Sequence, residues 1–163
     1  MHKKKHIWCS IMIFLIVVFD QLTKYLATAN LKSGKIISFI PNFVQFRYAE
    51  NTGMAFSMFS GARWIFVAVT AVVCICALVY LFTNKCNSLW VYWSLGVIVS
   101  GGIGNLIDRI LYGYVVDFIE PIFMNFAVFN IADCAVTLGA VVLIGYLVVD
   151  VFKSGDSKDG KQA

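Results

Sequence analysis

"WIFVAVTAVVCICALVYLF", residues 64–82, is an apolar run that contains no charged side chain. A helix that crosses the hydrocarbon core of a bilayer needs about 20 mostly apolar residues, and shorter runs are more typical of buried helices in soluble domains. Only one polar side chain, Thr70, interrupts the run. It therefore predicts a transmembrane helix, and the chain is expected to be an integral membrane protein.

The composition of the whole chain supports this expectation. Of its 163 residues, 60% are hydrophobic and 13% are charged, and the mean hydropathy is +0.81. Soluble domains carry about 25% charged residues, roughly twice the share found here. A chain of this length is expected to form one domain.

Three further apolar stretches are long enough to span a membrane: about 7–27, 89–111 and 130–149. Trp and Tyr residues gather near several of their ends, as interfacial anchors do. Together with residues 64–82, these stretches predict an α-helical membrane protein with four transmembrane helices in a single polytopic domain.

The segment of about 30–63 has a different pattern. "KIISFIPNFVQFRYA", residues 35–49, is rich in β-branched and aromatic residues and contains one proline. Such a run predicts short strands, and hence a small extramembrane β-sheet between helices 1 and 2. A short helix or loop is expected over 120–127. The polar tail of about 153–163 is expected to be disordered.

The first span permits a second interpretation. "HKKKH", residues 2–6, precedes an apolar run, and Ala27-Thr28-Ala29 resembles the cleavage site of a secretory signal peptide. However, "DQLTK", residues 20–24, lies between the apolar run and that site. This order favours a span that is retained.

The basic residues predict the orientation of the chain. Lys3–Lys5, Lys85 and the lysines after residue 152 fall on one side of the four spans. Cytoplasmic segments are enriched in Lys and Arg, so both termini are expected to be cytoplasmic. Four basic residues in the segment 30–63 weaken this bias. The net charge of +4 reflects the charged ends of the chain rather than a face that binds nucleic acid.

The polar residues of the spans converge on one level. Successive spans run in opposite directions, so the end of the first, the end of the third and the start of the fourth all lie near the outer face. Asp117 belongs to the outer connection between the last two spans. The residues concerned in the spans are Asp20, Lys24, Asn105, Asp108, Arg109, Asn130 and Asp133.

A purely structural role is one interpretation of this cluster. Asn130 is a favourable helix N-cap, and Asp133 three residues later completes a capping box. Asp20 and Lys24 form an i, i+4 pair in the favourable order. Asp108 or Asp117 could neutralise Arg109. A fully satisfied polar cluster is thus one explanation.

Catalysis is the other interpretation. Ionisable groups at membrane depth are candidates for function, and four carboxylates here face only two cations. Two carboxylates held close together cannot both ionise easily, so one serves as acid and the other as base on a shared water. Asp117 is not expected at a helix end, which makes it a candidate for such a pair. This is the machinery of an aspartic protease.

Other chemistries fit less well. The only histidines are His2 and His6, in the N-terminal tail, so neither a histidine-dependent triad nor an HExxH zinc site can be built. A Ser–Lys dyad would need Lys24 beside Ser57, Ser60 or Ser100, and Cys134 lacks a base. A proton or ion carrier remains the serious rival, but it would need polar residues through both halves of the membrane.

Cysteines give no sign of a metal, a cofactor or a disulfide framework. Their number is odd, and most of them lie in apolar runs, where cysteine behaves as a small hydrophobic residue. They are Cys9, Cys74, Cys76, Cys86 and Cys134.

Five ordered blocks resemble the signal peptidase II family. They are "DQLTK" (20–24), "ENTGMAF" (50–56), "GGIGNLIDR" (101–109), "VVDF" (115–118) and "FNIAD" (129–133). The resemblance implies an aspartic endopeptidase of the bacterial cytoplasmic membrane that cleaves the signal peptide of prolipoproteins before the diacylglyceryl-modified cysteine. Membrane lipids and globomycin-type cyclic peptide inhibitors would be its other partners.

The same resemblance implies a role for individual residues. Asp117 and Asp133 would form the catalytic dyad. Further residues would hold and orient the substrate and the dyad, or shape the outer end of the site: Asn51, Asn105, Arg109, Asn130, Asp20 and Lys24. Gly53 and Gly104 would allow close approach of the backbone.

Overall fold

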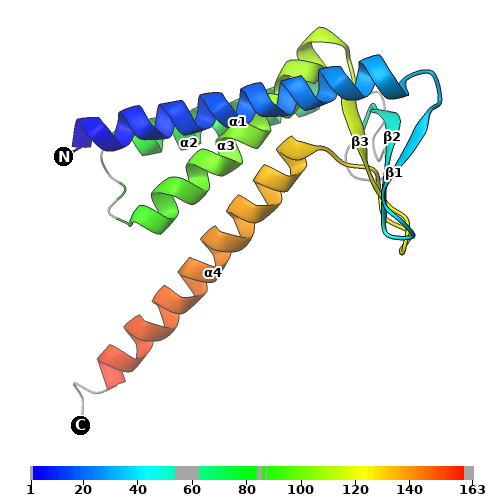
Figure 1. Ribbon diagram of the computed structural model, residues 1–163. Helices are drawn as coiled ribbons and strands as arrows, with labels where there is room; N and C mark the ends of the chain where they lie inside the picture. Colours follow the sequence, from blue (N-terminus) through cyan, green and yellow to red (C-terminus); the bar gives the residue numbers. More distant parts are fainter. Residues whose placement is uncertain (1, 54–62, 84–85, 87, 160–163) are drawn as a thin grey trace.

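A computed structural model describes residues 2–53, 63–83, 86 and 88–159 of the chain (Figure 1). Four helices make up most of this part: α1 (His2–Leu31), α2 (Arg63–Phe82), α3 (Leu89–Leu111) and α4 (Ile131–Asp159). All four are long and apolar enough to cross a membrane. The predicted integral membrane α-helical fold is therefore confirmed.

The observed helix bounds agree best with the predicted ones for the two central spans. The prediction of 89–111 coincides with α3, and 64–82 begins one residue after α2 begins. α1 and α4 both exceed the predicted spans. α4 includes residues 153–159, which the sequence analysis assigned to a disordered tail, because extending an existing helix is far easier than nucleating one. Residues 160–163 of that tail lie outside the described residues.

α3 lies at the centre of the bundle and contacts α1, α2 and α4. Small residues allow the close approach of α4. A Cβ added at Gly101 would meet the Ala132 carbonyl oxygen, and one added at Gly139 would lie 2.9 Å from the Ser94 carbonyl oxygen. Such small residues are the usual means of packing helices within a membrane. Beyond this contact α4 diverges from the other helices (Figure 1).

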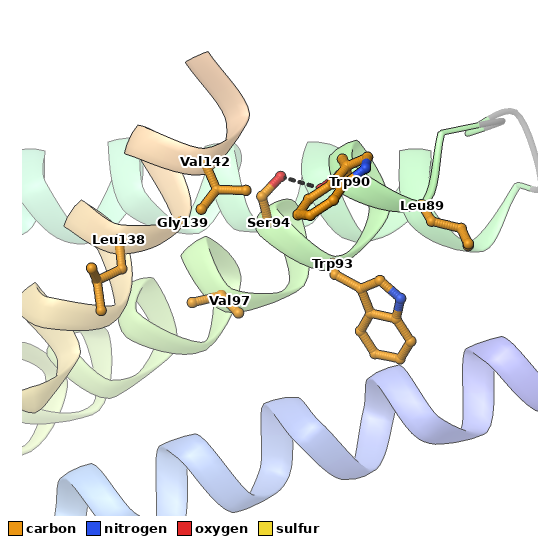
Figure 2. A pocket seen from close by; sticks show the side chains of 8 residues that line it. All are labelled: Leu89, Trp90, Trp93, Ser94, Val97, Leu138, Gly139 and Val142. Carbon is orange, nitrogen blue, oxygen red and sulfur yellow. Dashed lines mark hydrogen bonds between the residues drawn. The ribbon is translucent and has the colours of Figure 1, made fainter. Parts of the chain in front are cut away.

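An apolar groove lies between α3 and α4 at the end remote from the sheet. Its volume is about 610 Å³, and Trp90, Trp93 and Val97 of α3 line it together with Leu138 and Val142 of α4. Figure 2 shows Leu138 and Val142 on the α4 side and the two tryptophans towards the start of α3. Ser94, the polar side chain in the groove, donates to the Trp90 carbonyl oxygen (2.7 Å).

The extramembrane sheet has three antiparallel strands in the order β1-β2-β3. β1 (Ile36–Ile40) and β2 (Val44–Asn51) are the short strands predicted between the first two helices, and they pair as an antiparallel hairpin. β3 (Val115–Pro121) comes from the connection between α3 and α4, where the sequence analysis expected no strand. β3 ends at Pro121, so residues 120 and 121 belong to a strand and not to the helix or loop predicted over 120–127. β3 pairs with β2 along its length, with Asp117 opposite Ala49.

The sheet packs against the end of α1. Ala27 and Leu31 of α1 form a buried cluster with Phe118 of β3, and Phe46 of β2 and Ile131 of α4 pack against this cluster. Burial of these apolar side chains stabilises the contact between the sheet and the helices. The sheet therefore has a defined position at one end of the bundle.

Three of the five cysteines are buried. They are Cys9, Cys74 and Cys86, and all five cysteines are free thiols. Cys76 is exposed, contrary to the expectation of burial, because two residues along a helix from Cys74 it points to nearly the opposite side.

Candidate active site

The polar residues of the spans meet at the sheet end of the bundle, as predicted. Side chains from three helices and two strands are joined there by a continuous set of hydrogen bonds and ion pairs. The sheet contributes two of them, Asn51 from β2 and Asp117 from β3. Asn130 lies directly before α4, and the helices contribute the rest: Asp20, Lys24, Asn105, Asp108, Arg109 and Asp133.

Lys24 is the centre of a buried ion cluster. Its ammonium lies 2.9 Å from Asp20 Oδ2 and 3.1 Å from Asp108 Oδ2, and the three side chains are at most 4% exposed. Its third contact is Asn105 Oδ1, at 3.0 Å. The predicted i, i+4 pair of Asp20 and Lys24 is therefore present, and Asp108 joins it from another helix.

The two carboxylates of this cluster also hold backbone groups. Asp20 Oδ1 accepts from the Ala132 amide at the start of α4 (2.8 Å). Asp108 Oδ2 accepts from the Val116 amide of β3 (3.0 Å). Gln21, which the sequence analysis did not single out, donates to Asp20 Oδ2 and to Asp108 Oδ1. The ion cluster thus ties α1, α3, α4 and β3 together, and we assign it a structural role.

Gly104 is required by the position of Asp20. A Cβ at Gly104 would lie 2.5 Å from Asp20 Oδ2 and 3.2 Å from Ala132 Cβ. We expect Gly104→Ala to destabilise the protein by about 1–3 kcal/mol, because inserting a methyl group into a packed site forces its neighbours to move. The matched control is Gly145→Ala on α4, where nothing lies within 4 Å. Thermal unfolding in detergent measures both, and equal melting temperatures would contradict the prediction.

Asn130 and Asp133 form the predicted capping box at the start of α4. The Asp133 amide donates to Asn130 Oδ1 (2.9 Å), and the Asn130 amide donates to Asp133 Oδ2 (3.2 Å). These reciprocal bonds satisfy two amides that the first helical turn leaves without partners. They also fix the Asp133 carboxylate at the positive end of the α4 dipole.

Asn105 connects the ion cluster to Asp133. Because Asn105 Oδ1 accepts from Lys24, its amide nitrogen must point the other way, and it donates to Asp133 Oδ1 (2.7 Å). Asn105 Oδ1 also accepts from Asn130 Nδ2 (3.1 Å). Both oxygens of Asp133 therefore accept hydrogen bonds, and the carboxylate is held in one orientation.

Asp117 is held by two side-chain amides. Asn130 Nδ2 donates to Asp117 Oδ1 (2.6 Å), and Asn51 Nδ2 donates to Asp117 Oδ2 (3.0 Å). Both amide orientations are determined by backbone donors, since Asn130 Oδ1 accepts from the Asp133 amide and Asn51 Oδ1 accepts from the Gly53 amide. Asn130 thus touches both aspartates.

The environments of the two aspartates differ. Asp117 is only 2% exposed, whereas Asp133 is half-buried. Burial, and then the negative charge of Asp133, raise the pKa of Asp117 from its ordinary value of 3.8 to about 7. Asp117 is therefore suited to carry a proton near neutral pH.

Arg109 forms no direct ion pair with Asp108 or Asp117 in the described residues, although the negative charges of both, and of Asp133, act on it. Asp108 pairs with Lys24 instead, and Asp117 binds the two asparagines. Arg109 donates to the carbonyl oxygen of Gly53 (3.0 Å), whose amide in turn donates to Asn51. Arg109 therefore supports the segment that positions Asn51, and through it Asp117.

Arg63 is a further residue that the sequence analysis missed. It donates to the carbonyl oxygens of Arg109 (2.6 Å) and Ile110 (2.7 Å). Carbonyls in the last turn of a helix lack intrahelical partners, so Arg63, at the start of α2, caps the end of α3. No local signal marks this role, because the two helices meet only in the folded chain.

A cavity of about 430 Å³ opens beside Asp117. Its walls come from β2, β3 and the segment 125–128, and they include Asn51. Arg47 and Glu120 lie on its wall as an ion pair with an N–O distance of 2.8 Å. The cavity is therefore a polar space that leads directly to one of the two aspartates.

The alternative constellations are not assembled in the described part of the chain. Ser100 donates to the Val97 carbonyl oxygen, and Ser57 and Ser60 lie outside the described residues. His6 contacts Tyr92 with an Nδ1–O distance of 2.8 Å, near the start of α3 and away from the aspartates. Within the described residues, no group of three or more His, Cys, Asp or Glu is placed to hold a metal ion.

A family model described as signal peptidase (SPase) II matches residues 12–149. The chain belongs to the signal peptidase II family. Membership makes it a membrane-embedded peptidase with several spans, and it confirms the resemblance drawn from the five sequence blocks.

Proteins named lipoprotein signal peptidase are similar to this signal peptidase II chain. One from Streptococcus agalactiae is 40% identical over 134 residues, which are 82% of this chain and 87% of the relative. One from Enterococcus faecalis is 36% identical over 146 residues, 90% of this chain and 91% of the relative. A solved bacterial membrane enzyme superposes with a TM-score of 0.82 at 32% identity, covering 88% of both chains.

Proposed function

We propose that this protein is an aspartic endopeptidase that cleaves the signal peptide of bacterial prolipoproteins before the diacylglyceryl-modified cysteine. The observation that carries the proposal is the pair of Asp117 and Asp133, both hydrogen-bonded to Asn130 and held in unequal environments. The names of its relatives support the substrate class. The two aspartates are the proposed catalytic residues.

The unequal environments favour different roles for the two aspartates, one as the base and the other as the acid. Asp133, at the helix N-terminus and with both oxygens accepting hydrogen bonds, acts as the base and takes a proton from a water molecule. The water oxygen attacks the carbonyl carbon before the cysteine, while Asp117 gives its proton to the carbonyl oxygen. When the intermediate collapses, the C–N bond breaks and the leaving amine takes the proton from Asp133. One hydroxyl group of the intermediate returns its proton to Asp117, so that a carboxylic acid is released and the acid is restored.

Neighbouring residues position this pair. Asn51 and Asn130 orient Asp117, and Asn105 orients Asp133. Arg109 and Gly53 hold Asn51 in place. The polar cavity beside Asp117 suits an extended polypeptide, whereas the lipid on the cysteine and the apolar signal helix would remain in the bilayer. Globomycin-type cyclic peptides would compete for the same space.

The same proposal places the protein in the bacterial cytoplasmic membrane with both termini in the cytoplasm. Lys3–Lys5 and Lys153 lie at the ends of α1 and α4 that are remote from the sheet. If that side is cytoplasmic, as the distribution of basic residues favours, the dyad lies near the outer face. Removal of α1 after Ala29 would take Asp20 and Lys24 from the ion cluster, so we expect α1 to be retained.

A carrier or channel is the alternative function. It would require a polar path through the membrane. In the described residues the groove between α3 and α4 at the far end is lined mainly by apolar side chains. The confinement of the polar network to the sheet end therefore favours a peptidase.

A cleavage assay tests the proposal. Purified protein, reconstituted in lipid, is mixed with a diacylglyceryl-modified precursor peptide and with the same peptide lacking the lipid. We expect cleavage before the modified cysteine, at a rate that EDTA does not change. No cleavage of the lipidated peptide would refute the proposal, and loss of activity with EDTA would refute the metal-free aspartic mechanism.

The pKa of Asp117 predicts how activity and stability depend on pH. As the acid, Asp117 must be protonated, so we expect kcat/KM to fall as the pH rises through about 7. Because folding raises this pKa above 3.8, the stability that the group contributes is complete below that value and is lost as the pH rises through about 7. Rates measured between about pH 5 and 9 check the expected fall in activity. Glu50→Gln is the control, because Glu50 lines the same cavity. A flat profile would exclude Asp117 as the acid.

A further inference from the structure

Apolar side chains gather at the free end of the sheet. Phe39 of β1 is 62% exposed, Phe43 in the turn after β1 is 53% exposed, and Phe123 after β3 is 54% exposed. Phe43 and Phe123 stack with ring centroids 4.5 Å apart, and the Ile122 amide donates to the Phe43 carbonyl oxygen. We call this surface the apolar rim; it consists of Ile37, Phe39, Phe43, Ile122, Phe123 and Met124.

The rim lies at the level where the spans end. β1 follows the end of α1 closely, β3 follows the end of α3, and Phe129, next to the start of α4, pairs with Ile119 of β3. Figure 1 shows that the strands run across the axis of α1 rather than along it, and that the hairpin projects beyond the helices. The rim is therefore beside the helical bundle, near the surface of the membrane that the spans define.

The sheet has two different faces. Ile37 pairs with Phe46, and Phe39 stacks on Phe46 with centroids 5.0 Å apart. Since Phe46 packs against the buried cluster at the end of α1, Ile37 and Phe39 continue the face by which the sheet rests on the spans.

The opposite face is mainly polar, with Ile36, which pairs with Arg47, as an exposed apolar residue on it. Ser38 pairs with Gln45, one residue away from the pair of Ile37 and Phe46, and successive residues of a strand point to opposite faces. Gln45 and Arg47 both donate to Glu120, at 2.6 and 2.8–2.9 Å. One face of the sheet therefore suits water, and the other continues the apolar contact with the helices.

We propose that the apolar rim inserts into the membrane leaflet on the sheet's side, so that the sheet is an interfacial anchor as well as a wall of the site. Exposed apolar patches of this kind on a protein surface mark interaction sites, and aromatic rings favour the boundary between headgroups and acyl chains. The position of the rim beside the spans identifies the partner as phospholipid. The inference does not depend on the proposed reaction.

The anchor has a consequence for the site. β3 carries Asp117, and β2 carries Asn51, which binds it. A sheet attached to the leaflet at its free end and to the helices at its other end keeps Asp117 at a constant height relative to the membrane surface. A lipid-embedded substrate would then meet the dyad at a fixed depth.

An environment-sensitive fluorescent amino acid tests the proposal in the full chain. It is introduced by amber suppression at position 39, at position 123 or, as the matched control, at position 38. The protein is reconstituted in phosphatidylethanolamine and phosphatidylglycerol vesicles. We expect probes at 39 and 123 to emit at shorter wavelength, to be quenched by lipids brominated on the acyl chain and to be protected from aqueous iodide. The probe at 38 should show the opposite behaviour.

Two results would overturn the proposal. Equal quenching by iodide at positions 38, 39 and 123 would show that the rim stays in water. Protection at 39 and 123 that disappears when the ratio of protein to lipid is lowered would show that a second copy of the chain, not lipid, covers the rim. Unchanged melting temperatures of the three labelled proteins establish that the probe has not unfolded the sheet.

Discussion

Replacing either Asp117 or Asp133 with asparagine is expected to lower kcat by about 10³-fold or more, because each substitution removes one half of the proposed acid–base pair. Asparagine keeps nearly the same volume and retains an oxygen that accepts a hydrogen bond. At position 133 it also keeps a side chain able to complete the cap of α4. The loss should therefore affect turnover far more than the amount of folded protein. Cleavage of a lipidated precursor at equal membrane abundance measures it.

The control for this prediction is Asp150→Asn. Asp150 lies on the same helix as Asp133, at its opposite end, and is exposed. Its substitution should leave the rate unchanged. If Asp133→Asn retained nearly normal turnover, Asp133 would be a helix cap only, and the same result at position 117 would make Asp117 structural. Asp20 and Asp108 would be poor replacements, since both are engaged by Lys24.

Replacing Lys24 with methionine is expected to destabilise the protein by about 3–5 kcal/mol. The substitution leaves Asp20 and Asp108 buried without their cation, and breaking a buried pair by removing one partner typically has this effect. It also removes a donor to Asn105, which orients Asp133. We therefore expect a large fall in folded protein together with reduced turnover of what remains. Thermal unfolding and the cleavage rate per folded molecule measure the two effects.

Lys32 provides a control for Lys24, because it carries the same charge in an exposed ion pair instead of a buried one. Lys32 forms an ion pair with Glu50 at 3.2 Å, but both side chains are exposed, so Lys32→Met should change stability little. Adding Asp20→Asn to Lys24→Met should recover part of the lost stability, because it removes one of the two uncompensated charges. If Lys24→Met and Lys32→Met unfolded at the same temperature, the ion cluster would not have the structural role assigned to it.

The strand that carries Asp117 was the main element that sequence analysis missed. In "VVDFI", residues 115–119, apolar residues occupy both faces, so the alternation that marks a half-buried strand is absent. Its partner, β2, is distant in sequence, and the pairing of Asp117 with Ala49 exists only in the folded chain. The strands β1 and β2 could be predicted because their composition, rich in β-branched and aromatic residues, is typical of strands.

Side chains that bind groups on another helix could not be predicted from the sequence either. Gln21 binds carboxylates on α1 and α3, and Arg63 caps α3 from α2. Gln21 lies inside the block 20–24 and Arg63 directly before the span 64–82, but the partners of both are determined by how the helices cross. By contrast, the capping box of Asn130 and Asp133 could be predicted, because both of its hydrogen bonds join residues three positions apart.

The sequence by itself determined four spans, a sheet-forming segment, the common level of the polar residues and the cap of α4. These features depend on the length of apolar runs and on spacing within one helix, which are local properties. The tertiary structure alone decided which carboxylates pair with a cation. Asp20 and Asp108 are neutralised by Lys24, while Asp117 and Asp133 share Asn130 and lack an ion-pair partner in the described residues. The physical reason is that ion pairing and burial depend on distances between segments that only folding brings together.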